Sequence, residues 1–311
     1  MLRVASFNIN GIRATHRRGF GDWLEQRDCD VVALQEVRCP VDALPVGAFR
    51  GYHASYDPGS LPGRNGVAIL TRTRPVAVRT WNGAAYSVEA QHLWTDQPTA
   101  TELQTESVPL ARELRPFAME GRYIEVDLAD RPVTVASLYL PKGGLPSDLQ
   151  RPGRMREKPD GGARYARKMS FVKGFQRQLG ASRRAALRSG REFLLVGDLN
   201  IAHGPLDVAN WRRQQRSEGF LPQERAWFDQ QLGPRRLIDV MRQLDPDVQG
   251  PYTWWSWLGR AFENDTGWRI DYHLATPTLA HSAVTAVVER ETHRAARRSD
   301  HAAVVVDYDL R

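Results

Sequence analysis

Six short polar motifs lie along the chain, each beside an apolar run. Their side chains are carboxylates, amides, one phenol and one histidine, the types that bind a hard metal ion and hydrolyse a phosphodiester. The motifs are Ser6-Phe7-Asn8-Ile9-Asn10-Gly11, Leu34-Gln35-Glu36, Tyr139-Leu140-Pro141, Gly197-Asp198-Leu199-Asn200, Arg269-Ile270-Asp271 and Ser299-Asp300-His301. Because they are spread over almost the whole length, a site that uses all of them requires one fold that gathers them.

Apolar runs rich in β-branched and aliphatic residues predict the strands that hold these motifs. The predicted strands are residues 3–7, 31–34, 67–70, 123–126, 133–138, 193–196, 270–274 and 302–306. The residues at or just past strand ends are Asn8, Glu36, Tyr139, Asp198 and Asn200. Asp300 and His301 directly precede the last strand. Strand ends hold side chains more rigidly than loop tips do, so this placement suits catalysis.

Helical patterns separate several of the predicted strands. Phe20, Trp23 and Leu24 recur at i, i+3 and i+4, residues 169–179 repeat apolar positions every three or four residues, and residues 223–232 follow Pro222. The strand runs are mostly apolar without strict alternation, which indicates sheets that helices cover on at least one face. We expect an α/β fold in one domain, residues 1–311, because no linker-like stretch divides the chain.

Composition excludes several classes of protein. The chain is 41% hydrophobic and 25% charged, as in an ordinary globular protein, and it has no apolar run near the roughly 20 residues that a membrane span needs. Residues 2–7 resemble a strand rather than the apolar region of a signal peptide, so we do not expect a secreted protein. Cys29 and Cys39 match neither a disulfide framework nor a zinc site, so we expect free thiols in a cytoplasmic protein.

The positive charge is concentrated in one segment. The net charge is +7, but residues 151–191 hold 13 basic side chains against two acidic ones, a local excess of +11. A solvated helix face and a surface that neutralises a phosphate backbone both explain such a segment. Beside a phosphodiesterase site, the second explanation gains weight.

Each motif residue also has a structural explanation. Asn8 or Asn200 could cap a turn, Asp198 could begin a loop, Asp300 could be a surface acid, and Glu36 could pair with Arg38. Taken singly these explanations are the more common ones. Six coincidences in one chain favour a common site.

The motifs together resemble those of the exonuclease III family of AP (apurinic/apyrimidinic) endonucleases, within the endonuclease/exonuclease/phosphatase superfamily. The resemblance runs from about residue 2 to residue 307. It is carried by Ser-Phe-Asn-Ile-Asn-Gly-Ile-Arg-Ala, Leu-Gln-Glu-Val-Arg, Gly-Asp-Leu-Asn-Ile-Ala-His and Gly-Trp-Arg-Ile-Asp-Tyr. The resemblance implies a four-layered α/β sandwich, with two mixed β-sheets packed face to face and flanked by helices. It also implies one deep active-site cleft.

The resemblance also implies roles for the motif residues. Mg²⁺, with Mn²⁺ as an alternative, would be held by Glu36 with Asn8 and Asp300, while Asp198, Asn200 and His301 are candidates for a second position. Asp271 would orient His301, and Asp198 would be the general base, a task that family mechanisms divide with His301. Asn200 and Tyr139 would contact the phosphate, the attacking water or the leaving oxygen.

Aromatic residues would select the substrate. Trp254, Trp268 and Ile270 resemble the walls of the pocket that receives a flipped-out abasic sugar. Packing in the core is the competing explanation for these tryptophans, and for Trp255 and Trp257 it carries more weight. Arg13 and Lys142 are the further residues that we expect beside the DNA.

Several features depart from the family pattern. Lys142 stands where an amide is usual, and Arg38 stands where Lys is the commoner residue. Residues 81–118 and 146–162 are longer than expected; we expect the first to be a flexible surface excursion. The second is basic, and we expect it to become ordered on duplex DNA through Arg154, Arg156 and Lys158.

The predicted function is Mg²⁺-dependent cleavage 5′ to abasic sites in double-stranded DNA, with 3′–5′ exonuclease and 3′-phosphodiesterase activity at 3′ ends. Two alternatives remain: a relative that acts on a phosphoinositide, sphingomyelin or a nucleotide, and a DNA-binding protein without catalysis. The tryptophans and the basic segment disfavour the first, and the complete set of catalytic positions disfavours the second. We expect a DNA-repair enzyme that is a monomer with no membrane partner.

Overall fold

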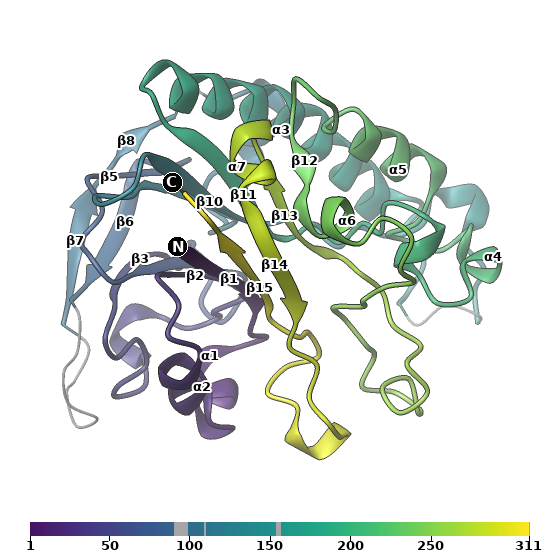
Figure 1. The fold of residues 1–311 in the computed structure, drawn as a ribbon. Coiled ribbons are helices and arrows are strands. Elements are labelled where there is room, and N and C mark those ends of the chain that lie inside the picture. Colours follow the sequence, from purple (N-terminus) through teal and green to yellow (C-terminus); the bar gives the residue numbers. More distant parts are fainter. Residues whose placement is uncertain (90–98, 109, 154–156, 311) are drawn as a thin grey trace.

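Two β-sheets packed face to face form the centre of the molecule, and helices cover their outer faces (Figure 1). The computed structural model describes residues 1–89, 99–108, 110–153 and 157–310. In that part of the chain one sheet has eight strands and the other seven, and both mix parallel with antiparallel neighbours. The four-layered α/β sandwich that the resemblance implied is therefore confirmed.

The eight-stranded sheet contains both ends of the described chain. In spatial order its strands are β14 (Ala283–Val288), β15 (Val304–Tyr308), β1 (Leu2–Asn8), β2 (Val31–Gln35), β4 (Val67–Thr71), β3 (His53–Asp57), β6 (Ala84–Val88) and β7 (Ala100–Gln104). β1 and β2 are parallel, so their carboxyl ends reach the same edge of the sheet. Leu2 lies opposite Tyr308, which places the first and last strands side by side.

The seven-stranded sheet contributes a second parallel pair. Its order is β12 (Ile238–Asp239), β13 (Asp271–Ala275), β11 (Glu192–Asp198), β10 (Val133–Tyr139), β9 (Tyr123–Asp127), β5 (Ala77–Thr80) and β8 (Glu106–Ser107). β10 and β11 run parallel and end together at Tyr139 and Asp198. β13 is antiparallel to β11, so its first residue, Asp271, lies directly across from Asp198.

Helices cover the two outer faces. The α-helices are α1 (Ile12–Arg17), α2 (Phe20–Arg27), α3 (Ala163–Arg188), α4 (Trp211–Gln214), α5 (Pro222–Asp229), α6 (Val240–Leu244) and α7 (Pro277–His281). The short 3₁₀ helices are η1 (Val41–Ala43), η2 (Arg112–Phe117), η3 (Ser147–Leu149), η4 (Pro205–Asp207) and η5 (Arg294–Ala296). α1 and α2 lie on the outer side of the eight-stranded sheet, and α3 and α5 lie over the seven-stranded sheet (Figure 1).

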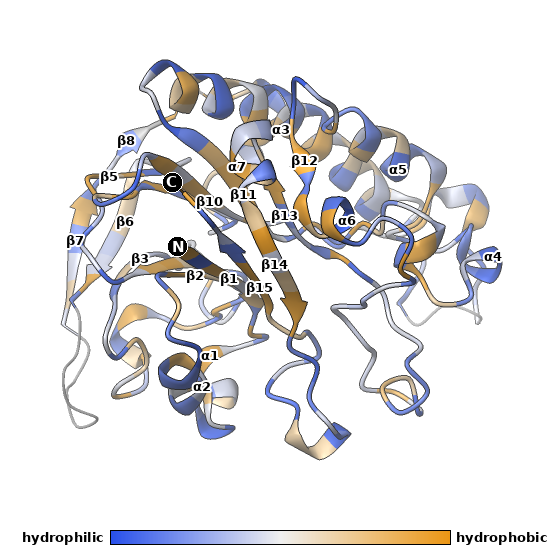
Figure 2. Cartoon of the chain, in the orientation of Figure 1, coloured by the Kyte–Doolittle hydropathy of each residue, from blue (hydrophilic) through white to orange (hydrophobic). Residues whose placement is uncertain are grey.

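The space between the sheets is apolar. Side chains of β1, β2 and β4 meet those of β9, β10 and β11 in one buried cluster that includes Val4, Ile69, Val126, Val135 and Val196. In Figure 2 the labelled central strands carry many hydrophobic residues, whereas hydrophilic and hydrophobic residues alternate along α3. Burial of these side chains, at about 25 cal/mol per Å² of apolar surface, is the main favourable contribution to folding.

The segment 81–118 departs from expectation. Its described part forms β6, β7, β8 and η2. β6 and β7 extend the eight-stranded sheet, while Leu114 and Phe117 of η2 pack against Phe171 and its neighbours on α3. The prediction of a flexible surface excursion was therefore wrong for these residues, because strand pairing holds β6, β7 and β8 to the sheets and buried apolar contacts hold η2 to α3. Residues 90–98 and 109 lie outside the described part.

The segment 146–162 carries internal contacts where it is described. The Gln150 side chain donates to Asp160 Oδ1 at 2.7 Å and accepts from the backbone N–H of Asp160 at 3.1 Å. Lys158 is exposed. Arg154 and Arg156 lie outside the described residues, so the expected ordering of this loop on duplex DNA stays a prediction. That residues 1–311 form a single domain also stays a prediction.

Candidate active site

The candidate site lies where the two parallel strand pairs end. Asn8 is the last residue of β1, Glu36 directly follows β2, and Asp198 is the last residue of β11. Asn8 Nδ2 donates to Glu36 Oε1 and to Asp198 Oδ2, both at 2.9 Å. A single buried amide therefore joins the two sheets at their catalytic edge.

The backbone around these residues adopts an uncommon conformation. Positive φ angles occur at Asn10 (46°), Glu36 (53°), Arg38 (53°) and Asn200 (48°), half of the eight non-glycine residues with positive φ in the described part. Side chains in this left-handed region are disfavoured, and such residues concentrate at functional sites. The sharp turns place the Glu36 and Asn200 side chains beside Asp198.

His301 is held between two carboxylates. Its Nδ1 lies 2.8 Å from Asp271 Oδ2, and its Nε2 lies 3.8 Å from Asp198 Oδ2. Burial would lower the pKa of His301, but the charge and hydrogen bond of Asp271, together with the charges of Asp198 and Asp300, outweigh burial and raise it. For Asp198, burial raises the pKa, and the charge of Asp271 adds to the rise while His301 opposes it. The Asp271–His301–Asp198 arrangement suits proton transfer.

Three of these residues could hold a metal ion. One ligand atom each from Glu36, Asp198 and His301 lies within 4.8 Å of the others, and all three residues are buried. Carboxylate oxygens suit hard ions such as Mg²⁺, and Asp271 Oδ1 is buried without a hydrogen-bond donor among the described residues. The donor set and this excess of negative charge fit a divalent cation.

Asp300 lies outside that group of three. Its Oδ1 accepts from Asn10 Nδ2 at 2.7 Å and its Oδ2 accepts from Trp254 Nε1 at 3.1 Å. Arg38 donates to Asn10 Oδ1 at 2.6 Å and also forms an ion pair with Glu36 Oε2. Glu36 thus forms the expected ion pair with Arg38 and also lies among the candidate catalytic residues.

Asn200 is fixed from several directions. Its backbone N–H donates to Asp198 Oδ1 at 2.8 Å, and its Nδ2 donates to the carbonyl of Leu140 at 2.9 Å. Tyr139, half-buried at the end of β10, lies with its ring centroid 5.1 Å from the Arg122 guanidinium. Burial raises the pKa of Tyr139 to about 12, so the phenol keeps its proton at neutral pH and can donate a hydrogen bond.

Lys168 is a site residue that sequence reasoning missed. It is fully buried on α3, and its Nζ contacts Glu224 Oε1 at 2.6 Å, the Asn200 carbonyl at 2.9 Å and the Lys142 carbonyl at 3.0 Å. One ammonium thus connects three separate motif segments. The helical spacing does indicate that Lys168 is buried, because it falls on the same helix face as Phe171 and the apolar positions that follow.

An aromatic group lies directly beside the acidic cluster. Trp254 and Trp268 exchange two backbone hydrogen bonds of 2.9 Å, and Ile270 and Phe220 pack with them. Trp268 meets Phe220 edge-on at a centroid distance of 6.3 Å. Because Trp254 also donates to Asp300, the tryptophans and the candidate catalytic residues form one continuous structure.

The other two tryptophans of this segment have separate surroundings. Trp255 is 1% exposed, packs edge-on against Phe262 and donates to Asp265 Oδ1 at 2.9 Å. Trp257 lies under the Arg297 guanidinium, 4.2 Å from its ring centroid. The structural explanation thus describes Trp255 well.

Lys142 and Arg13 are placed differently. Lys142 Nζ pairs with Glu218 at 3.0 Å and Glu157 at 3.2 Å, and the adjacent Gly219 approaches the Trp268 ring. Lys142 therefore lies near the aromatic group with its charge already matched by carboxylates. Arg13 is exposed on α1, near Cys39, and no described contact joins it to Trp254 or Trp268.

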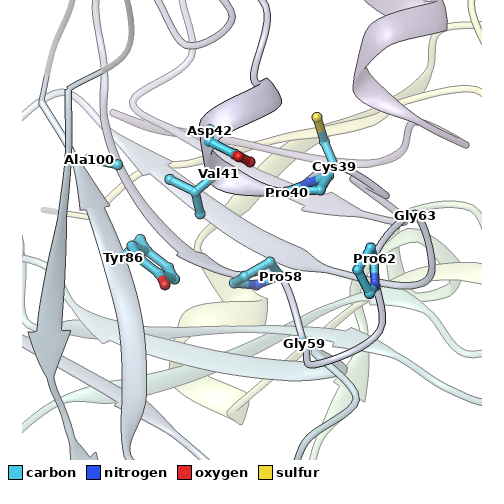
Figure 3. Close-up of a pocket in the computed structure, with 10 residues that line it drawn as sticks. All are labelled: Cys39, Pro40, Val41, Asp42, Pro58, Gly59, Pro62, Gly63, Tyr86 and Ala100. Carbon is cyan, nitrogen blue, oxygen red and sulfur yellow. The ribbon is translucent and has the colours of Figure 1, made fainter.

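A pocket of about 510 Å³ lies elsewhere, beside η1 and β6 (Figure 3). Tyr86, Pro58 and Pro62 line it, while the sulfur of Cys39 is turned away from Tyr86 and donates to the Ala43 carbonyl at 3.1 Å. None of the candidate catalytic residues lines this pocket. The chemistry of the side chains, rather than cavity size, therefore locates the candidate active site.

Known proteins are similar to this chain in both sequence and fold. Residues 5–301 match the model of the endonuclease/exonuclease/phosphatase family. The chain is 26% identical over 309 residues to the DNA repair nuclease APEX1 of Danio rerio, covering 98% of this chain and 81% of that protein. It is 26% identical over 282 residues to the exodeoxyribonuclease of Bacillus subtilis (strain 168), covering 89% of each.

Solved structures agree. An AP endonuclease from Archaeoglobus fulgidus superposes with a TM-score of 0.72 at 25% identity, covering both chains fully. The chain belongs to the endonuclease/exonuclease/phosphatase family. Its relatives include AP endonucleases and an exodeoxyribonuclease, as the sequence resemblance indicated. Among the described helices, none combines the length and apolar character of a membrane span.

Proposed function

We propose that this chain is a Mg²⁺-dependent AP endonuclease of DNA repair, which cleaves the backbone 5′ to abasic sites and also acts at 3′ ends. The observation that carries the proposal is the buried cluster of Glu36, Asp198 and His301 beside the Trp254–Trp268 pair. The cluster supplies the reaction, and the aromatic pair supplies a surface for a sugar without its base. The names of the relatives support the same activity.

Glu36 would hold the metal ion together with Asp198, and Asn8 would fix the orientation of both carboxylates, which leaves His301 Nε2 for the proton of the attacking water. When bound, the ion supplies positive charge to the scissile phosphate and lowers the pKa of a water molecule. Asp300 would act from the outer side of the cluster, through Asn10 and Trp254.

Asp198 and His301 would move the proton of the attacking water. Asp271, 2.8 Å from His301 Nδ1, keeps the imidazole oriented with Nε2 toward Asp198. Asn200 would contact the phosphate or the nucleophile with its amide. Tyr139 would donate its phenolic proton to a phosphate oxygen or to the leaving 3′ oxygen.

Trp254, Trp268 and Ile270 would receive the abasic deoxyribose after it leaves the helix, and a nucleotide with its base would be too large. Lys142 would contact phosphate once Glu157 and Glu218 release it. Arg13 would contact the backbone from α1, outside the pocket. The free, buried thiols of Cys29 and Cys39 support a cytoplasmic location, and we propose a monomer as the active form.

The experiment that tests this function is cleavage of a duplex with one abasic analogue. The protein is incubated with the duplex and Mg²⁺, with Mn²⁺, or with EDTA, and the products are mapped. We expect one nick 5′ to the analogue with either metal ion and no cleavage with EDTA. Binding without a nick would contradict catalysis, and a nick that persists in EDTA would contradict the metal requirement.

The pocket has its own test. Replacing Trp268→Ala should reduce the preference for abasic over intact duplex, because the variant loses one wall of the sugar site. Trp257→Ala, in the same segment but stacked on Arg297, is the matched control. Unchanged discrimination in Trp268→Ala would remove this residue from the pocket.

A further inference from the structure

A cavity lined by arginine lies between α3 and the connection from α5 to β12. It measures about 160 Å³, and Arg183, Arg184, Arg236, Gln176, Gln230 and Gln231 are among its lining residues. Arg183 Nη1 donates to the Arg235 carbonyl at 2.6 Å, so the two segments touch. In Figure 1 the loop between α5 and β12 reaches the level of α3. Side chains from two separate elements therefore form this cavity.

The arginines of this cavity have no carboxylate partner. In the described part of the chain, Arg183, Arg184, Arg235 and Arg236 form no ion pair, whereas Arg177, one turn and a half earlier on α3, pairs with Glu113. Asp229, at the end of α5, is bound to His203 Nε2 at 2.5 Å. The positive charge of the cavity is therefore unbalanced by protein groups.

Arg183 shows the consequence of this imbalance. Its Nε is buried and donates to no acceptor among the described residues. Burial lowers the pKa of Arg183, and the neighbouring charges of Arg184 and Arg236 lower it further. An unsatisfied buried donor destabilises the fold, and the effect is larger when the group is charged. An anion with several acceptor oxygens would satisfy this donor and relieve the repulsion.

The chemistry of the lining selects the kind of anion. Guanidinium groups present N–H donors in a planar fork that matches two oxygens of a phosphate, and charge-assisted bonds of this kind are roughly twice as strong as neutral ones. The glutamine amides can donate further bonds. A compact tetrahedral oxyanion is thus a better fit than an extended apolar ligand.

The cavity is distant from the catalytic cluster. Lys168, which contacts the Asn200 carbonyl, lies 15 residues before Arg183 on the same helix, which corresponds to about 22 Å at 1.5 Å per residue. The arginines therefore touch neither the candidate metal ligands nor the aromatic group. A ligand here would occupy a second site.

We propose that this cavity binds a phosphate group, either of a free phosphate anion or of the backbone of a nucleic-acid segment outside the catalytic cluster. The proposal goes beyond the proposed function, and it holds or fails independently of cleavage at abasic sites. A free phosphate anion and a backbone phosphate would bind the arginines through the same kind of contact. Only the backbone phosphate would make the arginines part of the duplex-binding surface.

Titration with inorganic phosphate tests the site. Three full-length proteins are compared by calorimetry at constant ionic strength: the wild type, Arg183→Gln/Arg236→Gln, and the control Arg112→Gln/Arg115→Gln, which removes the same charge from exposed positions on η2. We expect the first double variant to lose at least about tenfold in phosphate affinity at one site, and the control to match the wild type. Equal phosphate binding by all three proteins would overturn the proposal.

A second titration identifies the source of the phosphate. Binding of an intact duplex is followed over a range of salt concentrations. If a backbone phosphate occupies the cavity, the plot of the logarithm of the DNA association constant against the logarithm of the salt concentration should be less steep by about one in Arg183→Gln/Arg236→Gln. If a free anion occupies the cavity, the steepness should not change. Nicking of abasic duplex should stay within about twofold in all three proteins; a large loss in the first double variant alone would overturn the assignment as a separate site.

Discussion

Two buried charged clusters lie on either side of Ile270, and they differ in charge balance. Arg269 is fully buried and pairs with Asp239 at 2.7 and 3.0 Å and with Asp207 at 2.8 Å. Arg242 adds a second cation, 2.5 Å from Asp207. Two arginines thus face two aspartates. Burial would raise the pKa of Asp207, but Arg269 and Arg242 outweigh it and leave the pKa below its ordinary value.

The catalytic cluster, which begins two residues later at Asp271, lacks this balance. Glu36, Asp198 and Asp271 converge there and face two cationic partners, Arg38 beside Glu36 and His301 between the two aspartates, so one carboxylate is left unmatched. Burial raises the pKa of Asp198, in the opposite direction to Asp207. Equally buried aspartates of one chain thus serve different ends. In the first cluster each charge has a partner, so the loss of one partner would destabilise the fold, and in the second an unmatched negative charge prepares a site for a cation.

The largest effect should come from the catalytic cluster. Asp198→Asn and His301→Asn each remove a group that handles the proton of the attacking water, so each should lower the nicking rate by roughly 10²–10⁴-fold. Affinity for abasic duplex in EDTA should change little. Single-turnover cleavage and fluorescence anisotropy measure the two quantities. Near-normal turnover in either variant would remove that residue from catalysis.

A substitution in the charge-balanced cluster of Arg269, Arg242, Asp207 and Asp239 should lower the stability of the protein rather than its activity. Asp239→Asn leaves the Arg269 guanidinium underpaired in the core, and we expect a loss of about 3–5 kcal/mol in the free energy of unfolding. Urea denaturation measures the loss, and Asp247→Asn on the exposed loop before β13 is the control. The nicking rate per folded molecule should stay near that of the wild type. A stable Asp239→Asn protein that has lost its activity would reverse the roles of the two clusters.

Unlike the two clusters, His273 is a buried group that has no charged partner among the described residues, and its expected effect is smaller. Burial lowers its pKa from 6.5 to about 3. Between these values the unfolded chain binds a proton that the folded chain does not, so the contribution of His273 to stability is lost as the pH falls below 6.5. From pH 7 to pH 5 we expect this group to contribute a decrease of about 2 kcal/mol.

Variants isolate that contribution from the other titrating groups. His273→Gln should show a smaller decrease in unfolding free energy between pH 7 and pH 5 than the wild type, whatever its absolute stability. The exposed His281→Gln should keep the wild-type slope. Equal slopes in all three proteins would mean that His273 takes up a proton in the folded state.

The central strands were predictable from sequence. All eight predicted runs coincide with strands to within about two residues, because continuous β-branched and aliphatic runs are typical of strands buried on both faces. Seven of the described strands were missed: β3, β5, β6, β7, β8, β12 and β14. Among them, β3 has the mixed sequence His-Ala-Ser-Tyr-Asp, and β14 exposes Val284 and Val287 at the sheet edge. Local sequence does not report such strands, because pairing with a neighbour decides them.

The site was predictable in membership rather than in geometry. Asn8, Glu36, Asp198 and His301 lie close together, as their positions beside strand ends indicated, and Asp271 lies with them, as the resemblance implied. The link from Trp254 to Asp300 depends on tertiary packing, which no spacing in the sequence encodes. The same holds for the three contacts of Lys168 and the pairing of Lys142 with Glu157 and Glu218.

The proposed metal site is tested most directly by the effect of Mg²⁺ on the unfolding free energy of the wild type and of Glu36→Gln. A ligand that binds only the folded state stabilises it by about 2.7 kcal/mol at a concentration of 100 times Kd. We predict such stabilisation of the wild type and a much smaller one of Glu36→Gln, whose stability without the ion should not fall. Equal stabilisation of both proteins, or of neither, would contradict the assignment of the unbalanced cluster as the metal site.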